Sequence, residues 1–564
     1  MFVKLTHSGP RSYVQLVEAY RDDAGRPKQR TVVTLGRLDQ LDSGLDSVIA
    51  GLLRVTGKAA PTAAPAPTIN FESARDFGDV WALTELWNSL GFDRLKRVFR
   101  RTRHAIDVEA LVRVMVLNRL CDPESKLGVL RWVQTVTLPG AFDGAIEHQH
   151  LLRAMDAMVE HQDEVEVVLA GLLRPLVDQD LAVVFYDMTT IRAAGLSDED
   201  GDVRQFGMSK EGVIARQIML GVVQTAEGLP LYHEVFDGNT SEVQTLKPTL
   251  DKIVKRFPVK RVIAVADRGL LSVENLEELK TITLPGGGHL EFILAVPGRR
   301  YGEFAELLEP LQTTRFDKAT QEVLGETVWE QLRLIVAHDP HTAQQATDKR
   351  DALIKALQDK AEQLAKKLDA QEAGTPGRGR KLSDGGARAR FYHEVAEAHM
   401  VRIIRVDMKS ELFTYDIDDK ALARAKLMDG KLLLVTNVKD LTPAEVVKRY
   451  KSLADIERGF RVLKSEIEVG PIHHRLPDRI RAHATICFIA LILYRVMRTR
   501  LHAGGATHSP ERALQRLRRI QHHRVTLNAS QPMTGLSSVD QEQAGILAAL
   551  TIKKPSLNTQ LTLL

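Results

Sequence analysis

Three acidic residues stand where the chain could hold divalent cations. Asp187 follows the apolar run 182–186, and Asp267 follows the apolar run 262–266. Each run is typical of a buried strand, so both carboxylates are expected at the C-terminal edge of a sheet, where open α/β sheets place ligands. A single Asp after a strand is more often a turn or cap residue. The pair therefore becomes informative only with a third acid.

Glu457 is the candidate third acid. It lies on a helix predicted from Thr442, where Thr, Pro and Glu form a capping box. Tyr450, Glu457 and Lys464 follow at seven-residue intervals, close to two helical turns, so we expect them on one stripe. Such a stripe is also common on half-buried surfaces that have no function. Two acids on other faces of the helix are weaker candidates for this role: Asp455 and Glu466.

The elements that would position these acids alternate from residue 181 onward. Apolar runs predict strands at 181–186, 214–223, 231–236, 262–266 and 290–296, with a helix from Ser241. This alternation predicts a mixed α/β sheet. Between residues 298 and 441 the alternation breaks down, and an amphipathic helix at 342–370 predicts a helical hairpin. We expect this range to be an insertion into the α/β domain.

Outside the α/β domain and its insertion, the sequence predicts four further segments. Residues 1–56 predict an N-terminal hairpin module, 57–69 an Ala/Pro linker, 70–178 a helical domain and 501–564 a C-terminal helical region. The helical domain carries a dense basic segment, interpreted either as a solvated face or as a surface that contacts DNA phosphates. Its cations are Arg94, Lys96, Arg97, Arg100, Arg101 and Arg103.

Composition sets limits on the class of protein. The 564 residues carry a net charge of only +4, so local clusters of cations, rather than the whole chain, must indicate a nucleic-acid partner. The two cysteines lie in apolar helical patterns and predict buried thiols rather than a disulfide or a zinc site. The apolar run 484–494 is about half a membrane span, and we expect a cytoplasmic protein without a membrane segment.

Several motifs together resemble the bacterial insertion-sequence DDE transposases that carry a YREK signature. They are YDMTT around Asp187, GMSKEG at 207–212, GNTSE at 238–242, VADRGLLS around Asp267, YKSLADIERGFRVLK at 450–464, and NRLCDPESK at 118–126. The resemblance runs from the first residues to about residue 500. It implies a ribonuclease-H-like catalytic domain in two parts, 179–297 and 442–500, interrupted by the insertion.

The signature itself departs from the family at one position. Tyr450, Glu457 and Lys464 match it, but Leu453 stands where the family has arginine. Arg449, Arg458 and Arg461 are the candidates to replace the missing cation.

The resemblance implies DNA strand cleavage and strand transfer at the ends of an insertion sequence. Asp187, Asp267 and Glu457 would hold two Mg²⁺ ions, for which Mn²⁺ can substitute, because hard oxygen ligands suit these cations. Water would free a 3′-OH, which would then attack target DNA. Tyr450 and Lys464 would hold phosphates near the scissile bond. The implied partners are the terminal inverted repeats and target DNA, bound by a homodimer on paired ends.

Other interpretations stay open for some residues and for the whole chain. In related transposases an aromatic residue from the insertion stacks on a flipped base, so Trp329 is a candidate beside ordinary core packing. The histidines at 473, 474 and 483 are expected to be structural or to contact the DNA backbone rather than to bind metal. The chain could also be an inactive relative that only binds DNA, or a metallohydrolase acting on a small phosphate ester.

Overall fold

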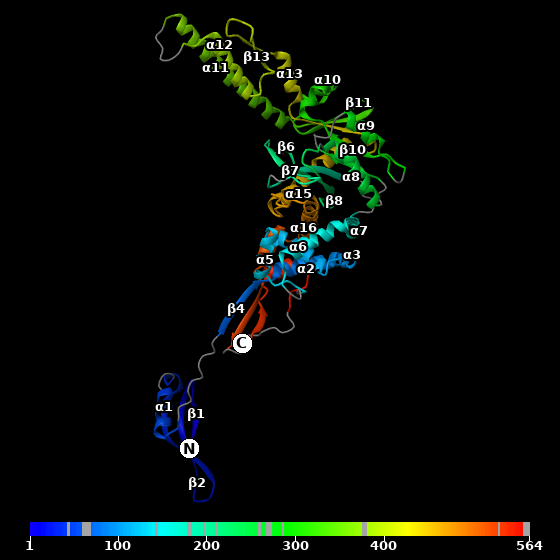
Figure 1. Cartoon of the computed structure of the whole chain (residues 1–564). Coiled ribbons are helices and arrows are strands. Elements are labelled where there is room, and N and C mark those ends of the chain that lie inside the picture. Colours follow the sequence, from blue (N-terminus) through cyan, green and yellow to red (C-terminus); the bar gives the residue numbers. More distant parts are fainter. Residues whose placement is uncertain are drawn as a thin grey trace. The chain divides into compact units, whose positions relative to one another are not determined.

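The structure is a computed structural model that describes most of the chain. The described residues are 1–41, 45–58, 69–140, 145–177, 183–195, 198–208, 212–240, 242–257, 261–266, 273–284, 287–374, 381–527 and 531–556. The chain forms two compact units (Figure 1): Met1–Glu72 with Val525–Met533, and Ser73–Arg524 with Thr534–Leu564.

The N-terminal residues form a three-stranded antiparallel sheet of β1 (Phe2–Ser8), β2 (Arg11–Arg21) and β3 (Pro27–Arg37), followed by α1 (Leu45–Val55). The predicted hairpin corresponds to β2 and β3, and β1 is an additional strand. A two-residue turn joins β1 to β2, and Gly9 adopts a left-handed φ of 60° in it. The Gly-Pro pair at this turn was the signal for the third strand.

The range predicted as a helical domain consists mainly of helices, while its boundaries and its DNA-binding role stay predictions. It contains α2 (Gly78–Leu90), α3 (Leu95–Phe99), α4 (Val108–Cys121), α5 (Lys126–Thr135), α6 (His148–Glu160) and α7 (Gln162–Leu173). Side-chain caps fix two of the helix starts, because Asp107 accepts a hydrogen bond from the Ala110 N–H and Ser125 accepts one from the Gly128 N–H.

A large mixed sheet forms the centre of the second unit. Its strands are β5 (Val183–Arg192), β6 (Gln205–Met208), β7 (Ile214–Thr225), β8 (Pro230–Asp237), β9 (Ile263–Ala266), β10 (Glu291–Ala295), β11 (Val323–Trp329), β12 (Leu332–His338) and β15 (Lys431–Thr436). The order β8-β7-β5-β9-β10 joins three antiparallel strands to two parallel ones. This is the expected ribonuclease-H-like sheet, and the α/β class is confirmed.

The range predicted as an insertion supplies strands to this sheet. β11, β12 and β15 extend it beyond β10. The rest of the range forms α11 (Pro340–Glu372), α12 (Asp384–Glu397), β13 (Ile404–Val406), β14 (Tyr415–Ile417) and α13 (Asp419–Met428). Ile354, Leu357 and Ala361 of α11 pack with Phe391 of α12 in a second, small core. The predicted helical hairpin is confirmed, and α11 and α12 lie side by side (Figure 1).

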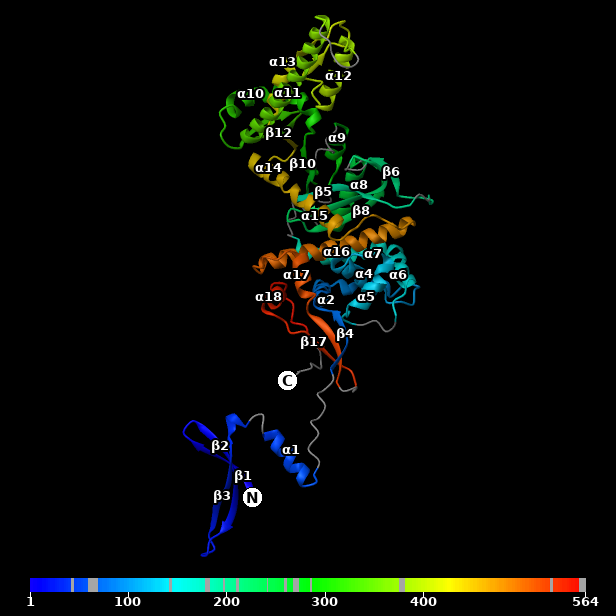
Figure 2. The same ribbon diagram turned by 90° about the vertical axis from the view of Figure 1, so that its left-hand side faces the viewer.

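Helices cover the sheet. They are α8 (Glu242–Arg256), α9 (Val273–Thr281), α10 (Ala305–Leu311), α14 (Pro443–Lys451), α15 (Leu453–Ser465) and α16 (Pro477–Ala503). α16 packs against β8 on one side and against α4 and α6 on the other (Figure 2). This helix therefore joins the sheet to the helical region.

α16 is longer than the apolar run that the sequence suggested. Of the described helices it is the one whose length and composition would suit a membrane crossing, with a mean hydropathy of 1.6 over its most apolar window. Within that window 89% is buried in the fold, as in the core helix of a folded domain. The predicted buried thiols are confirmed, with Cys487 on α16 and Cys121 at the end of α4.

The C-terminal residues form α17 (Pro510–Leu517), β16 (Gln521–Leu527), β17 (Met533–Leu536) and α18 (Gln541–Ala549), and β4 spans Ile69–Asp76. The region predicted as helical thus also contains two strands, consistent with the β-branched residues Val525 and Thr526. Arg518, which follows α17, pairs with the buried carboxylate of Asp79 at 2.9 Å. This cation therefore supports the fold.

Candidate active site

Asp187 lies inside β5, whereas the sequence placed it just after a strand ending at residue 186. The correction follows from the two neighbours of β5. The parallel neighbour β9 pairs with β5 only as far as Phe185, but the antiparallel neighbour β7 continues to pair as far as Arg192. The aspartate thus lies just beyond the parallel pairing. Its carboxylate is half-buried, and Oδ1 accepts a hydrogen bond from the Met188 N–H at 2.7 Å.

Strand pairing shows which face of the sheet carries Asp187. Asp187 pairs with Val222 of β7, and Val222 pairs with His233 of β8. Residues paired directly across antiparallel strands share one face. His233 contacts α16, because its ring stacks on Phe488 with 4.3 Å between centroids. Asp187 is therefore on the face of the sheet that α16 covers.

The opposite face carries the neighbours of Asp187. Tyr186 and Met188 are buried, and the hydroxyl of Tyr186 is hydrogen-bonded to that of Thr245 on α8 at 2.6 Å. Thr245 also donates to the Met188 sulfur at 2.9 Å. These contacts hold the residues before and after Asp187 in the core. The backbone that carries the aspartate is therefore fixed in position.

α15, the helix that contains Glu457, packs against β5. At Gly459 the approach is so close that an added Cβ would lie 2.9 Å from the Gln224 side-chain nitrogen. Gln224 pairs with Phe185, two residues before Asp187, and therefore faces the same side as Asp187. The sequence did not single out Gly459 or Gln224. A glycine inside a helical pattern was the available signal for this close packing.

Two of the predicted acids have side chains outside the described residues. Asp267 falls in the range 267–272, immediately after β9, and the side chain of Glu457 is likewise not described. Among the side chains that are described, His, Cys, Asp and Glu form no group of three that could hold a metal ion. The convergence of Asp187, Asp267 and Glu457 therefore stays a prediction.

The helix predicted to carry the whole signature is divided at Ser452 into α14 and α15. The hydroxyl of Ser452 donates to the Lys448 carbonyl at 3.1 Å, and its N–H is shared between the carbonyls of Lys448 and Arg449. This local bonding competes with the regular helical pattern. Tyr450 lies on α14 and Lys464 on α15, so their seven-residue spacing from Glu457 does not run along one uninterrupted helix.

The exposed face of α15 is cationic. Arg458, Arg461 and Lys464 follow at three-residue intervals and are all exposed. Between them Phe460 and Leu463 turn into the core. This arrangement presents three positive charges to solvent beside the strand of Asp187.

The basic segment 94–103 is also exposed. It runs through a short turn of helix and α3, with Leu95 and Phe99 buried and the cations outward. Arg103 pairs with Glu160 at 2.6 Å. In the described part of the chain, no acidic partner is found for Arg97, Arg100 and Arg101, and Arg94 likewise extends from the surface. These charges are available to an anionic partner.

Trp329 ends β11 and is half-buried. Its ring lies 5.1 Å from that of Phe304, and the guanidinium of Arg300 lies 6.0 Å from the ring centre. These contacts account for the residue as core packing at the edge of the sheet. Its proposed contact with a flipped base stays a prediction.

Family models match two parts of the chain. The profile of the transposase DDE domain matches residues 178–493, and that of the IS1634 family transposase N-terminal domain matches residues 3–64. A comparison with curated proteins gives no match. Among solved structures, the Drosophila P element transposase strand transfer complex shares 12% identity over 74% of this chain and 86% of its own, with a TM-score of 0.21, too low to carry an argument. Since the DDE profile spans more than half of the sequence, the chain belongs to the insertion-sequence DDE transposases.

Proposed function

We propose that the protein cleaves DNA strands at the ends of an insertion sequence and joins the freed 3′-OH to target DNA. The observation that carries this proposal is the packing of α15 on the sheet face of Asp187, which brings the helix of Glu457 to the strand of the first acid. The parallel register supports the role of Asp267, because Phe185 pairs with Val265 and each aspartate follows two residues later.

Members of this family use divalent metal ions, and we propose two Mg²⁺ ions, with Mn²⁺ as a substitute. The donor set fits, because carboxylate oxygens are the ligands that these hard cations prefer. Asp187, Asp267 and Glu457 would hold these ions. Bound ions would supply Lewis-acid stabilisation of the charge that develops at the phosphate. The fixed backbone around Asp187 would hold its carboxylate in place.

The exposed cations of α15 suit the task of holding DNA beside these acids. Arg458, Arg461 and Lys464 are exposed, so they can contact phosphates without any rearrangement of the core. Tyr450 is half-buried against the core and would offer its phenol at the end of α14. Their role is to align the scissile phosphate with the acids, which lowers the entropic part of the barrier.

The partners follow from this chemistry. Cutting both ends of one element in concert requires two catalytic sites, so we propose a homodimer on paired ends, acting in the cytoplasm. The N-terminal sheet and the exposed cations Arg94, Arg97, Arg100 and Arg101 are the proposed end-binding surfaces. Sedimentation of the protein with end fragments tests the dimer, and one protein chain per end pair would contradict it.

Asp187→Asn tests the proposed activity. Even changes around a metal ligand commonly cost 10- to 100-fold in activity, so loss of a direct ligand should lower strand cleavage by at least about 100-fold. Binding of the same end fragment should change only a few-fold. Asp237→Asn, at the exposed end of β8 in the same sheet, is the matched control and should cleave normally. A wild-type protein that binds ends but never cuts them would identify a DNA-binding relative instead.

A further inference from the structure

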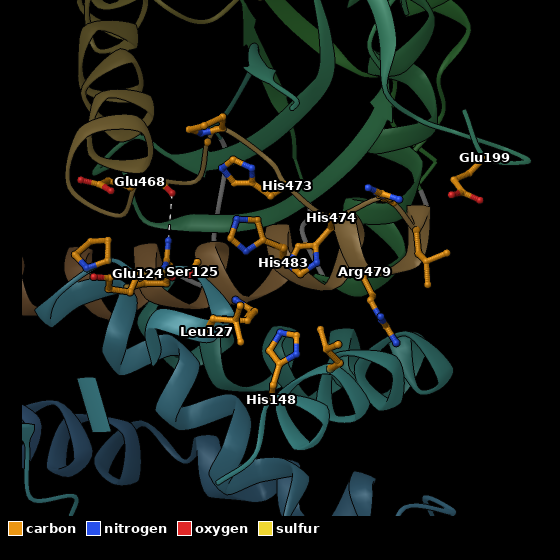
Figure 3. A pocket seen from close by; sticks show the side chains of 18 residues that line it. Glu124, Ser125, Leu127, His148, Glu199, Glu468, His473, His474, Arg479 and His483 are labelled. Atoms are coloured by element: carbon orange, nitrogen blue, oxygen red, sulfur yellow. Dashed lines mark hydrogen bonds between the residues drawn. The ribbon is translucent and has the colours of Figure 1, made fainter. Parts of the chain in front are cut away.

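A cavity of about 660 Å³ lies between the helical region and the segment that joins α15 to α16. Figure 3 shows His473, His474 and His483 on one side of it and His148, from α6, on the other. Every residue that lines it belongs to the second unit. The active-site proposal uses none of them.

Two buried cations line this cavity without a carboxylate partner. Arg119 is 4% exposed, and its guanidinium donates to the carbonyls of Glu468, at 3.2 Å, and of Glu124. Lys126 is 7% exposed, and within the described residues its ammonium makes no hydrogen bond or ion pair. Two buried positive charges whose partners are neutral carry a desolvation cost that a bound anion would offset.

The titration of Lys126 agrees with this geometry. Burial, followed by the neighbouring charge of Arg119, lowers the pKa of Lys126 to about 8. The amine therefore still carries its proton at neutral pH. An acidic neighbour would raise this pKa, so the lowered value agrees with the lack of a carboxylate beside the ammonium.

Helix starts add to the positive potential. The first residue of α5, Lys126, and the first residue of α6, His148, both line the cavity, as does Leu476, the N-cap of α16. The free N–H groups and the dipole at a helix N-terminus attract anions. Three helices of at least ten residues begin at this one cavity.

The acidic and histidine side chains at the cavity do not cancel this potential. Glu124 lies 3.7 Å from Arg131, and the carboxyl groups of Glu199 and Glu468 lie at opposite ends of the cavity in Figure 3. Burial lowers the pKa of His474 to about 4 and that of His483 well below its usual value, so both rings are neutral hydrogen-bonding groups at pH 7. Arg475 adds an exposed cation at the rim, whereas the guanidinium of Arg479 is paired with the carboxylate of Asp156 at 2.8 Å.

We infer that this cavity is a second phosphate-binding site, in which Lys126, Arg119 and the three helix starts hold a phosphate group of a DNA strand. The choice of DNA as the source of the phosphate rests on the proposed function. The anion site itself rests on the two buried cations that lack a carboxylate partner among the described residues. A strand that reaches this cavity would be held by α5 and α6 of the helical region and by the segment that follows α15.

The first test uses inorganic phosphate at pH 7 and follows the melting temperature of the whole protein. Wild type should melt higher in phosphate than in chloride of equal ionic strength. Lys126→Met should lose this rise, although it should melt as high as wild type or higher in chloride, because a buried unpaired charge has been removed. Lys355→Met, an exposed lysine on α11, is the matched control and should keep the rise.

A second variant, at the exposed rim of the cavity, separates loss of phosphate binding from an effect on folding. Arg475 is exposed and has no partner within the described residues, so Arg475→Gln should leave melting in chloride unchanged and weaken the response to phosphate. A full phosphate response in Lys126→Met would overturn the inference.

The second test asks whether DNA supplies the phosphate. Gel shifts on an end fragment across a range of salt should show that Lys126→Met lowers the slope of log affinity against log salt by about one, as expected when one phosphate is no longer bound. Fragments with and without a 5′-phosphate separate a terminal phosphate from an internal one. An unchanged slope with both fragments would overturn DNA as the source. Neither test depends on strand cleavage, so a failure of the proposed activity would be seen separately.

Discussion

Leu453 shows how the fold accommodates a change in the family signature. It stands where the signature carries arginine, and its side chain is 8% exposed, packed at the start of α15 against the main core. A guanidinium at this position would have to enter that core. The exposed Arg458 and Arg461 are one to two turns farther along the same helix, where a cation stays in solvent and lowers the stability of the fold little.

Leu453→Arg should therefore destabilise the protein instead of restoring a phosphate contact. Burying an unpaired charge and losing the leucine packing should lower the unfolding free energy by at least about 2 kcal/mol. Urea unfolding followed by tryptophan fluorescence measures the change. Ala454→Arg, at the next and exposed position, should have little effect. Equal stability of the two variants, with tighter end binding by Leu453→Arg, would show that the arginine is accepted at the site.

The sequence was informative at this scale where chemistry restricts residue type. It singled out Asp187 as a candidate from an acid after an apolar run, but did not show its place inside β5, because the end of a strand depends on how far each neighbour pairs. Lys126 lay in a motif without an assigned role, since nothing in a one-dimensional pattern shows that its ammonium is buried without an acid. Partners from distant segments decide such cases.

At the scale of elements, α16 joins the sheet to the helical region, and a buried histidine of the sheet contacts this helix. His233 of β8 stacks on Phe488, and its Nε2 lies 3.1 Å from the Thr485 hydroxyl. Burial, with a smaller effect of the Arg256 charge, lowers the pKa of His233 to about 3. The ring is therefore neutral in the folded protein at pH values where the unfolded chain is protonated.

This histidine should make stability depend on pH. Because its folded-state pKa lies below the unfolded value near 6.5, its contribution is complete above pH 6.5 and is lost as the pH falls from 6.5 towards 3. His233→Phe keeps the stacking, and the Thr485 hydroxyl still donates to the Arg481 carbonyl. Between pH 6.5 and 5, the free energy of unfolding measured with urea should fall by about 1.5 kcal/mol less in the variant than in wild type. Identical losses would contradict this role.

Elements were predicted well where periodicity was strong. Strands β7, β8, β9 and β10 of the central sheet and the long helix α11 lie close to their predicted ranges. The division of α14 from α15 was missed, because a serine whose side chain bonds back to the preceding turn leaves the hydrophobic period unchanged. Strands β11, β12 and β15 and their pairing with the central sheet were missed as well, since the range 298–441 was expected to be an insertion and strand partners far apart in sequence leave no local signal.

At the scale of the whole molecule, the exposed cations of α3 and its flanks form the surface that we propose for binding DNA. Arg97, Arg100 and Arg101 extend from a short helix whose apolar side is fixed in the core. Reversing these three charges to Glu should weaken end binding and lower its salt dependence by about one unit of slope for each phosphate that is no longer bound. Gel shifts at several salt concentrations measure both quantities.

The matched control reverses three exposed lysines on α11, Lys349, Lys355 and Lys367, and changes the net charge by the same amount. If both triple variants bind ends equally, the effect belongs to net charge and the DNA-binding surface lies elsewhere.

The domain boundaries expected from the sequence stay predictions, and the extension of the central sheet by strands from residues 298–441 makes the insertion less separate than its sequence pattern indicated.

The most direct test of the account is strand cleavage by Glu457→Gln with Mg²⁺, beside a gel shift on the same end fragment. Gln keeps the shape of the side chain but lacks the charge that a divalent ion requires, so cleavage should collapse while end binding stays within a few-fold or tightens. Glu466→Gln, an exposed acid at the end of α15, should cut normally. Normal cutting by Glu457→Gln, with loss of cutting in Glu466→Gln, would contradict the assignment of the third acid.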